Sequence, residues 1–429
     1  MSILNVVGQP VVRKDTTSKA LGTAQYTGDL EMKGLLVGKA LRSQYPHARI
    51  LGIDTSEAEK MPGVHAVITA KDIPGENAFG LAIKDQPVLA FDKVRMMGDA
   101  VALVAAETDE QAEAALEKIR VDYEELPGVY TIEDAIKEGA PLVHEGQLDG
   151  NIMQHTKVRK GDVEAGFAES YLVVENTFET QRVDHAYIEP ETSLAFFEDD
   201  GTLNVLTSTQ YPFRDRRQIA PVLNMPYNHV RVTQMVTGGG FGGKDDITTE
   251  IQASLLALKT GRPVRVTWSR RESMVCSTKR HPMKIWIKSG VSKDGHLLAM
   301  EGTVYSDKGA YCSIGHFITK KAGLHLAGPY YIPNVKTDTY AVYTNNTLCG
   351  PYRGFGILQA SFAHDSQMDI LAEKLGISPL EIRMINALRP GLSNATGQVF
   401  NESIGFYDTL LRAQEYMESH PWKGCESDD

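Results

Sequence analysis

The chain has 429 residues, of which 42% are hydrophobic and 23% are charged, and its formal net charge is −11. This length exceeds a single ordinary core, so two or more globular domains are expected. No apolar run approaches the ~18 residues of a membrane span, and the acidic charge argues against nucleic acid as a partner.

Cysteine usage and the amino terminus bear on the compartment. Cys276, Cys312, Cys349 and Cys425 are widely separated and form no C-x-x-C pair. Neither an iron–sulfur cluster nor a structural zinc is therefore predicted. The first residues lack the basic patch and long apolar core of a signal peptide, so a reducing cytoplasm is the expected location.

Residues 1–130 have the pattern of one domain. Strands are predicted at 64–69, 99–106 and 121–123. Between the last two, Thr108 and Gln111 form a capping-box pattern that starts a helix. The strand–helix–strand order predicts a small α/β domain.

Residues 131–150 are interpreted as a connector, and strand patterns dominate from residue 151 onward. A short basic helix is expected at 214–223, and Ser378 with Pro379 and Glu381 is a strong helix start. The last residues, 416–429, form a polar tail. Further strands are predicted at 171–175, 194–197, 203–207, 264–268, 283–288 and 296–305.

The most distinctive stretch joins a predicted strand at 230–236 to a predicted helix at 245–259, which Gly261 ends. Five glycines surround Phe241 in the loop 238–243. Glycine allows a ligand to approach the backbone closely, and the free N–H groups at a helix start attract anions. The loop is therefore a candidate cradle for phosphate or another anion.

Two nucleotide-binding motifs fit this loop only in part. A P-loop needs Ser or Thr after the lysine, and Lys244 is followed by Asp245. The dinucleotide fingerprint needs an acid at the end of the next strand, and here Arg270 and Arg271 follow that strand. A nucleotide-binding module and a plain glycine-rich turn both stay open at this point.

Two other strings have related chemistry. Gln210 ends the strand that carries Ser-Thr-Gln, and residues 350–356 read Gly-Pro-Tyr-Arg-Gly-Phe-Gly. Arg353 supplies a fork of donors suited to oxo groups, and glutamine supplies a donor and an acceptor. The set Gln210, Phe241 and Arg353 resembles the molybdenum-binding subunit of the xanthine dehydrogenase and aldehyde oxidase family of molybdenum hydroxylases.

The resemblance covers most of the chain. Strings at 42–50, 62–64 and 88–95 are similar to the family's hammerhead domain, and strings at 279–282 and 307–311 to its first molybdopterin domain. The resemblance implies an α+β fold. An N-terminal α/β hammerhead domain (1–130) and the connector would precede the first molybdopterin-binding domain of mixed sheets and helices (151–415).

The resemblance also implies a pterin-held molybdenum, which in the family is often the cytosine dinucleotide form. The pterin holds the metal, so no protein ligand is expected. Gln210 and Arg353 are the implied catalytic residues. The implied cofactor-binding residues are Gln210, Gly239, Gly240, Phe241, Gly242, Gly243, Tyr352, Arg353 and Gly354.

In the family, the catalytic glutamate lies in a second molybdopterin domain, and no Gly-Glu string follows residue 145 here. The chain therefore resembles the split-subunit kind known from nicotinate dehydrogenase. The implied partners are a second molybdopterin subunit with the glutamate, a 2Fe-2S subunit and an FAD subunit. A hetero-oligomer that hydroxylates a substrate and passes electrons on is expected.

Three residues bear on the substrate. Asp245 matches a glutamate and Lys321 an arginine that xanthine-type enzymes use to hold the purine, and Phe355 matches a phenylalanine that stacks on the substrate. These matches favour a purine or related N-heterocycle. The alternatives are a helix-start acid for Asp245, a solvated lysine pair for Lys321 and a core residue for Phe355.

Other functions also stay open: an aldehyde oxidoreductase or nicotinate dehydrogenase-like subunit of the family, or a paralogue that only binds the pterin. Arg353 could instead make a structural carboxylate pair. Glu189 and Glu191 are not expected to be catalytic acids, because Pro190 interrupts their strand pattern.

Overall fold

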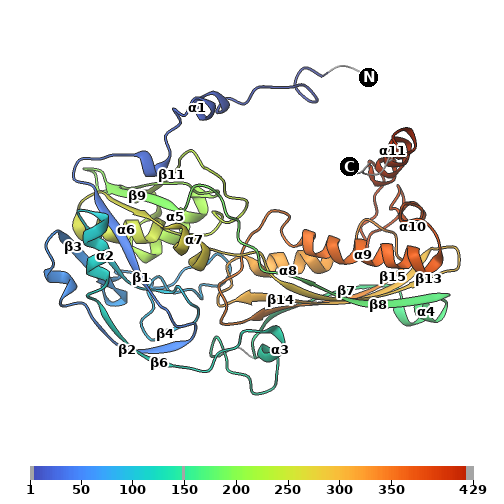
Figure 1. The fold of residues 1–429 in the computed structure, drawn as a ribbon, viewed down its shortest axis with the longest axis horizontal. Coiled ribbons are helices and arrows are strands. Elements are labelled where there is room, and N and C mark those ends of the chain that lie inside the picture. The colour runs from blue at the N-terminus through green and yellow to red at the C-terminus, as the bar shows by residue number, and fades with distance from the viewer. Residues whose placement is uncertain (1–3, 147–149, 422–429) are drawn as a thin grey trace, which may run out of the picture.

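The structure is a computed structural model that describes residues 4–146 and 150–421. It is a mixed α+β fold, as predicted, with three β-sheets. A seven-stranded sheet and a three-stranded sheet lie in one lobe, and a long five-stranded sheet forms the other (Figure 1). No helix within the described residues combines the length and the apolar character that crossing a membrane requires.

The seven-stranded sheet has the order β11-β10-β9-β12-β1-β5-β3. Helix α6 (Glu250–Thr260) is buried over most of its length and packs its apolar residues against this sheet. The strands are β1 (Leu36–Arg42), β3 (Val64–Thr69), β5 (Ala100–Ala106), β9 (Thr192–Phe197), β10 (Leu203–Thr207), β11 (Val230–Gln234) and β12 (Val264–Thr267).

This sheet combines strands from both sides of the predicted connector. β1 pairs in parallel with β12, so Leu36 lies beside Val264. A Cβ on Gly38 would come within 2.6 Å of side-chain atoms of both Leu256 and Val266. Glycine therefore lets α6 and β12 pack directly on β1, and residues 1–130 share one core with later residues.

The three-stranded sheet contains β4 (Lys93–Val94), β2 (Ala48–Asp54) and β6 (Arg120–Glu125). Helix α2 (Asp109–Leu116) begins with the predicted capping box, in which the side chain of Thr108 accepts from the Gln111 N–H. β5 and β6, which flank α2, lie in different sheets. The predicted strand–helix–strand order is present, but its two strands do not pair, because β5 pairs with β1 and β3 and β6 pairs with β2.

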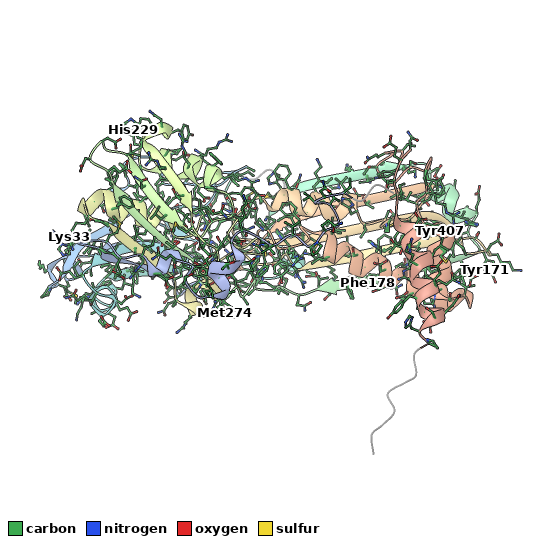
Figure 2. The ribbon with its side chains drawn as sticks, turned by 90° about the horizontal axis from the view of Figure 1, so that it is seen from above. Lys33, Tyr171, Phe178, His229, Met274 and Tyr407 are labelled. Carbon is green, nitrogen blue, oxygen red and sulfur yellow. The ribbon has the colours of Figure 1, made fainter. Side chains whose placement is uncertain are left out.

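The five-stranded sheet has the order β7-β15-β14-β13-β8. Helices α8 (Gly315–Leu324), α9 (Ile357–Leu375) and α10 (Pro379–Asn386) share its apolar core. Figure 2 places Tyr171 and Tyr407 at the far end of this lobe, opposite Lys33 and His229. The strands are β7 (Ile152–Lys160), β8 (Leu172–Thr180), β13 (Met283–Val291), β14 (Leu297–Gly309) and β15 (Asn334–Tyr343).

Several short helices complete the chain. α1 (Thr16–Ala20) lies in the N-terminal segment away from both lobes, and α11 (Phe406–Ser419) packs on α10 (Figure 1). The part of the predicted polar tail beyond residue 421 lies outside the described residues. The remaining helices are α3 (Ile132–Ala135), α4 (Val163–Ala168), α5 (Pro212–Val222) and α7 (Arg270–Cys276).

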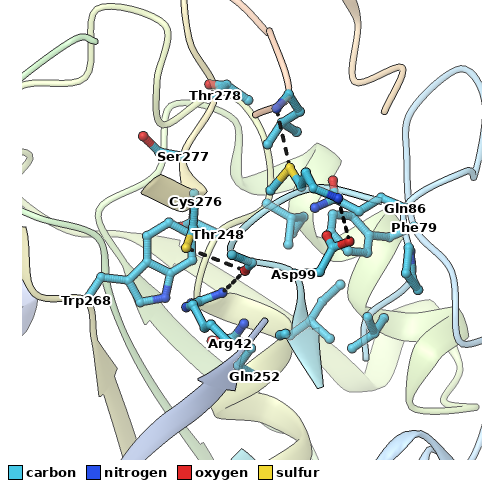
Figure 3. A pocket seen from close by; sticks show the side chains of 18 residues that line it. Arg42, Phe79, Gln86, Asp99, Thr248, Gln252, Trp268, Cys276, Ser277 and Thr278 are labelled. Atoms are coloured by element: carbon cyan, nitrogen blue, oxygen red, sulfur yellow. Dashed lines mark hydrogen bonds between the residues drawn. The ribbon is translucent and has the colours of Figure 1, made fainter. Parts of the chain in front are cut away.

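A small cavity of about 50 Å³ with polar and apolar lining residues lies where β1 meets α7 (Figure 3). Arg42 at the end of β1 donates to the Gly98 carbonyl at 3.1 Å and to Glu272 at 3.1 Å. Its guanidinium lies 4.7 Å from the ring centre of Trp268. The thiol of Cys276 donates to the same Gly98 carbonyl at 3.5 Å. Arg42 thus attaches the N-terminal strand to the helix that follows β12.

Candidate functional site

The glycine loop follows β11 and has an unusual backbone. Gly239, Phe241 and Gly242 have φ values of 102°, 51° and 101°. The loop does not lead directly into a helix, since α6 begins at Glu250 and not at the predicted residue 245. The prediction that helix-start N–H groups face the loop's ligand is therefore wrong, and the loop's own backbone supplies the donors.

Side-chain contacts of Asp245 and Asp246 explain why α6 begins later than predicted. The Asp245 carboxylate accepts from Arg214 on α5 at 3.0 Å, and Asp246 accepts from the Ser313 hydroxyl. Asp245 is buried and Asp246 is half-buried, and both are held by other elements of the fold. Bends and irregular backbone therefore occupy residues 245–249, although Ile247 still packs into the core.

Three segments that are far apart in the sequence converge at this loop. Gln210 accepts from the Gly242 N–H through Oε1 at 2.9 Å, and its own N–H donates to the Lys244 carbonyl at 2.8 Å. The Arg353 N–H donates to the Phe241 carbonyl at 2.9 Å. A Cβ on Gly242 would lie 2.6 Å from the Pro351 carbonyl oxygen. The structure thus brings together the predicted loops at 238–243 and 350–356 and Gln210.

The polar groups at this junction that have no partner within the described residues are hydrogen-bond donors. Within the described residues, the N–H groups of Gly239, Gly240 and Phe241 donate to no other atom. The Oε1 atom of Gln210 is already engaged, so its Nε2 group is the end that stays available. Arg353 is exposed, and its guanidinium makes no ion pair with any described residue. Successive free N–H groups, an amide and a guanidinium suit an anionic cofactor.

An irregular segment, 185–191, contacts both loops, and the sequence analysis assigned it no role. His185 lies 2.7 Å from the Pro351 carbonyl through Nε2, and burial lowers its pKa, so the neutral ring donates there. Glu189 accepts from the Gly238 N–H at 2.6 Å. Glu191 accepts from the Tyr187 hydroxyl inside the core. No strand or helix pattern in the sequence marked this segment, because Pro190 interrupts it and Ala186 has a φ of 50°.

Lys244 distinguishes this loop from a P-loop. Its side chain is 2% exposed, and its ammonium lies 2.8 Å from Glu189 and 4.7 Å from the ring centre of Tyr187. A P-loop lysine must reach the phosphates of a nucleotide. Here the lysine is buried and paired, so this geometry does not support the nucleotide-binding alternative.

The three predicted substrate residues lie near one another around α5 and α8. Phe355 has a φ of 52° and is half-buried, and the Lys321 ammonium lies 5.5 Å from its ring centre. Burial and the neighbouring Asp246 raise the pKa of Asp245 to about 7, although Arg214 opposes this shift. The Asp245 side chain is only 6% exposed. Its substrate contact stays a prediction.

Asp215 on α5 is another buried carboxyl group, and the direction of its pKa shift can be tested. It is fully buried, and neither carboxylate oxygen has a hydrogen-bond partner in the described structure. Burial, followed by repulsion from Glu250, raises its pKa well above the usual value. The folded protein therefore keeps a proton that the unfolded chain loses above pH ~4, so this group lowers stability as pH rises. We expect Asp215→Asn to raise the free energy of unfolding at pH 8 by about 1–3 kcal/mol.

Urea unfolding at pH 5 and pH 8 would check this expectation. The wild-type protein should lose more stability between the two pH values than Asp215→Asn does. Asp200 accepts from the Thr202 N–H at the surface, so Asp200→Asn is the matched control. Equal pH dependence in the wild type and Asp215→Asn would contradict the assignment.

The donors at this junction suit an anionic cofactor, and comparisons with known proteins identify the family of the chain. The family model of the molybdopterin cofactor-binding domain matches residues 143–387. The model of the aldehyde oxidase and xanthine dehydrogenase a/b hammerhead domain matches residues 21–127. The chain therefore belongs to the xanthine dehydrogenase and aldehyde oxidase family, as its sequence predicted.

Individual relatives show the extent of the likeness. The nicotinate dehydrogenase large molybdopterin subunit of Eubacterium barkeri is 43% identical over 410 residues, which cover 96% of each chain. A probable xanthine dehydrogenase subunit from Bacillus subtilis is 46% identical over 379 residues, which cover 88% of this chain and 50% of that relative. The solved aldehyde oxidoreductase from Desulfovibrio gigas matches with a TM-score of 0.90 at 35% identity, over 94% of this chain and 45% of that one. The chain thus spans nearly the whole length of the first relative and about half of the other two.

Proposed function

We propose that this chain is the cofactor-binding part of a multi-subunit molybdenum hydroxylase that acts on an N-heterocycle. The observation that carries the proposal is the convergence of donors from Gln210, the glycine loop and the loop with Arg353. In this proposal, Gly239–Gly243, Tyr352, Arg353 and Gly354 contact the pterin and its phosphate. If the cofactor is the cytosine dinucleotide form, these N–H groups would supply donors for its phosphates.

The residues of this chain would bind and orient the reacting groups. The cofactor, when bound, supplies an oxidising centre that accepts two electrons while oxygen from water is added to a substrate carbon. Gln210 and Arg353 would hold the anionic groups of the cofactor by charge-assisted hydrogen bonds. Phe355 would pack against the substrate ring. A glutamate on a partner subunit would take the proton, and 2Fe-2S and FAD subunits would remove the electrons.

The substrate proposal keeps three candidates. Asp245 and Lys321 support a purine through their match to purine-holding residues. The relative from Eubacterium barkeri supports a nicotinate dehydrogenase-like activity, since it aligns from end to end. An aldehyde oxidoreductase activity is the third possibility within the family. The cytoplasmic location also stays a prediction.

Purification of the native complex would test the proposal. We expect molybdenum in the complex, a partner chain that carries the catalytic glutamate, and transfer of labelled oxygen from water to an N-heterocycle. Asp245→Ala separates the candidates, because loss of purine turnover with unchanged aldehyde turnover would support the purine. Tight ATP binding without molybdenum would overturn the proposal.

A further inference from the structure

Residues 4–22 form an N-terminal arm that lies away from both lobes (Figure 1). Helix α1, which belongs to this arm, has no buried residue. Among the described residues, every hydrogen bond of residues 4–24 stays within that segment. Six large apolar side chains of the arm are 53–79% exposed: Leu4, Val6, Val7, Val11, Val12 and Leu21.

The composition of the arm is both apolar and basic. Arg13, Lys14 and Lys19 stand against a single acid, Asp15, in a chain whose net charge is −11. Contact of so many large apolar side chains with water is unfavourable, and a gathering of such side chains at a surface marks an interaction site. The arm therefore suits a partner surface that has an apolar groove with acidic residues beside it.

The root of the arm is fixed beside the glycine loop. Tyr26 forms a β-bridge with Val236, two residues before Gly238. A Cβ on Gly238 would lie 3.3 Å from the Cε1 atom of Tyr26. Arg265 on β12 holds the next turn, since its guanidinium donates to the Gly28 carbonyl at 2.9 Å. The arm therefore leaves the folded part of the chain at the edge where the glycine loop begins.

The proposed cofactor site is open to solvent in this chain. Phe241 at the tip of the glycine loop is 49% exposed, and Arg353 is exposed as well. β11, which leads into the loop, is an outermost strand of its sheet. In the proposed function, a glutamate of a partner subunit must approach the cofactor that these groups hold. That subunit has to cover the glycine loop, and the arm begins beside it.

Resting on the proposed function, we propose that the N-terminal arm binds the partner subunit that carries the catalytic glutamate and holds it over the cofactor site. The valine pairs at 6–7 and 11–12 fill an apolar groove of that subunit, and the basic residues of the arm contact acids at the border of the groove. A second copy of this chain is the poorer occupant, because it would bring a second set of donors to this edge.

Charges placed on the arm should weaken the complex. In the double variant Val11→Asp/Val12→Asp, two side chains that would be buried against the partner become charged. The dissociation constant between the two molybdopterin subunits, measured by sedimentation of the purified complex over a dilution series, should rise about 100-fold or more. Hydroxylation should fall at low protein concentration and recover at high concentration, because mass action restores the complex.

A matched control changes an exposed apolar side chain elsewhere. Leu51 on β2 is 64% exposed, and β2 lies on the opposite side of its lobe from α1 (Figure 1). Leu51→Asp should leave the dissociation constant unchanged within about twofold. Hydrogen exchange adds a direct measurement of the arm. The amides of residues 6–14 should exchange slowly in the wild-type complex and rapidly in the double variant.

The outcomes separate this inference from the proposed function. An unchanged dissociation constant in the double variant, or rapid exchange of the arm amides in the wild-type complex, would overturn the role of the arm. Separation of two copies of this chain in the double variant, with the glutamate-bearing subunit still bound, would also overturn it. A complex that is held through the arm but contains no molybdenum and hydroxylates no heterocycle would instead reject the proposed function and leave the arm's role in assembly standing.

Discussion

Replacing Gln210 with alanine is expected to reduce hydroxylation about 10²–10³-fold per bound molybdenum. The Gln210 side chain fixes the Gly242 N–H through Oε1 and leaves its Nε2 group to donate to the proposed cofactor. Arg353→Ala should produce a loss of similar size, because the exposed guanidinium makes no ion pair with other described residues. Activity of the purified complex, divided by its molybdenum content, is the measurement.

Conservative variants distinguish the loss of a hydrogen-bond donor from a loss of folded structure. Gln210→Glu keeps an acceptor for the Gly242 N–H and replaces the Nε2 donor with a negative charge, so its activity should be no higher than that of Gln210→Ala. Arg353→Lys keeps the charge and loses the bidentate fork. Unfolding of all these variants should match the wild type within about 1 kcal/mol. Full activity per metal in Gln210→Ala or Arg353→Ala would remove that residue from the site.

Glu189→Ala is expected to cost about 3–5 kcal/mol of stability and to empty the cofactor site. Glu189 binds both the Gly238 N–H and the Lys244 ammonium, which is almost completely buried. Its removal leaves a buried cation without a partner and releases the start of the glycine loop. The free energy of unfolding and the molybdenum content of the purified complex should fall together.

Two further variants test whether the unpaired charge of Lys244 causes the loss of stability in Glu189→Ala. Lys244→Met in the Glu189→Ala background removes the unpaired charge and should restore a large part of the lost stability, but not the anchor of the Gly238 N–H. Glu198→Ala, which breaks the exposed ion pair with Arg231, is the control and should cost at most about 1 kcal/mol. A Glu189→Ala protein with wild-type stability would show that Lys244 finds another partner.

Local sequence patterns predicted many single elements. The strand at β3, the capping box at Thr108 and the helix start at Ser378 were confirmed, because each depends on neighbouring residues alone. Helix α7 was missed although Ser269 and Glu272 form a capping box of the same kind. This capping-box pattern was present in the sequence, but the residues after 268 were interpreted only as the end of a strand.

The start of α6 could not be predicted locally. Asp245 and Asp246 would favour a helix start by themselves. In the structure, Arg214 and Ser313, both distant in the sequence, hold these carboxylates and keep the segment out of the helix. Tertiary contacts therefore overrode a favourable local preference.

The sequence by itself determined the family, the α+β class and the two glycine-rich loops. Unusual residue strings and their order can be recognised without knowledge of contacts. Only the tertiary structure decided that residues 1–130 share a sheet with later strands, that Glu189 anchors the glycine loop through Lys244, and that cations from α5 and α8 line one cavity. The physical reason is that each of these features joins groups far apart in the chain. Their pairing is set by packing and by the need to partner buried charges, which no local pattern records.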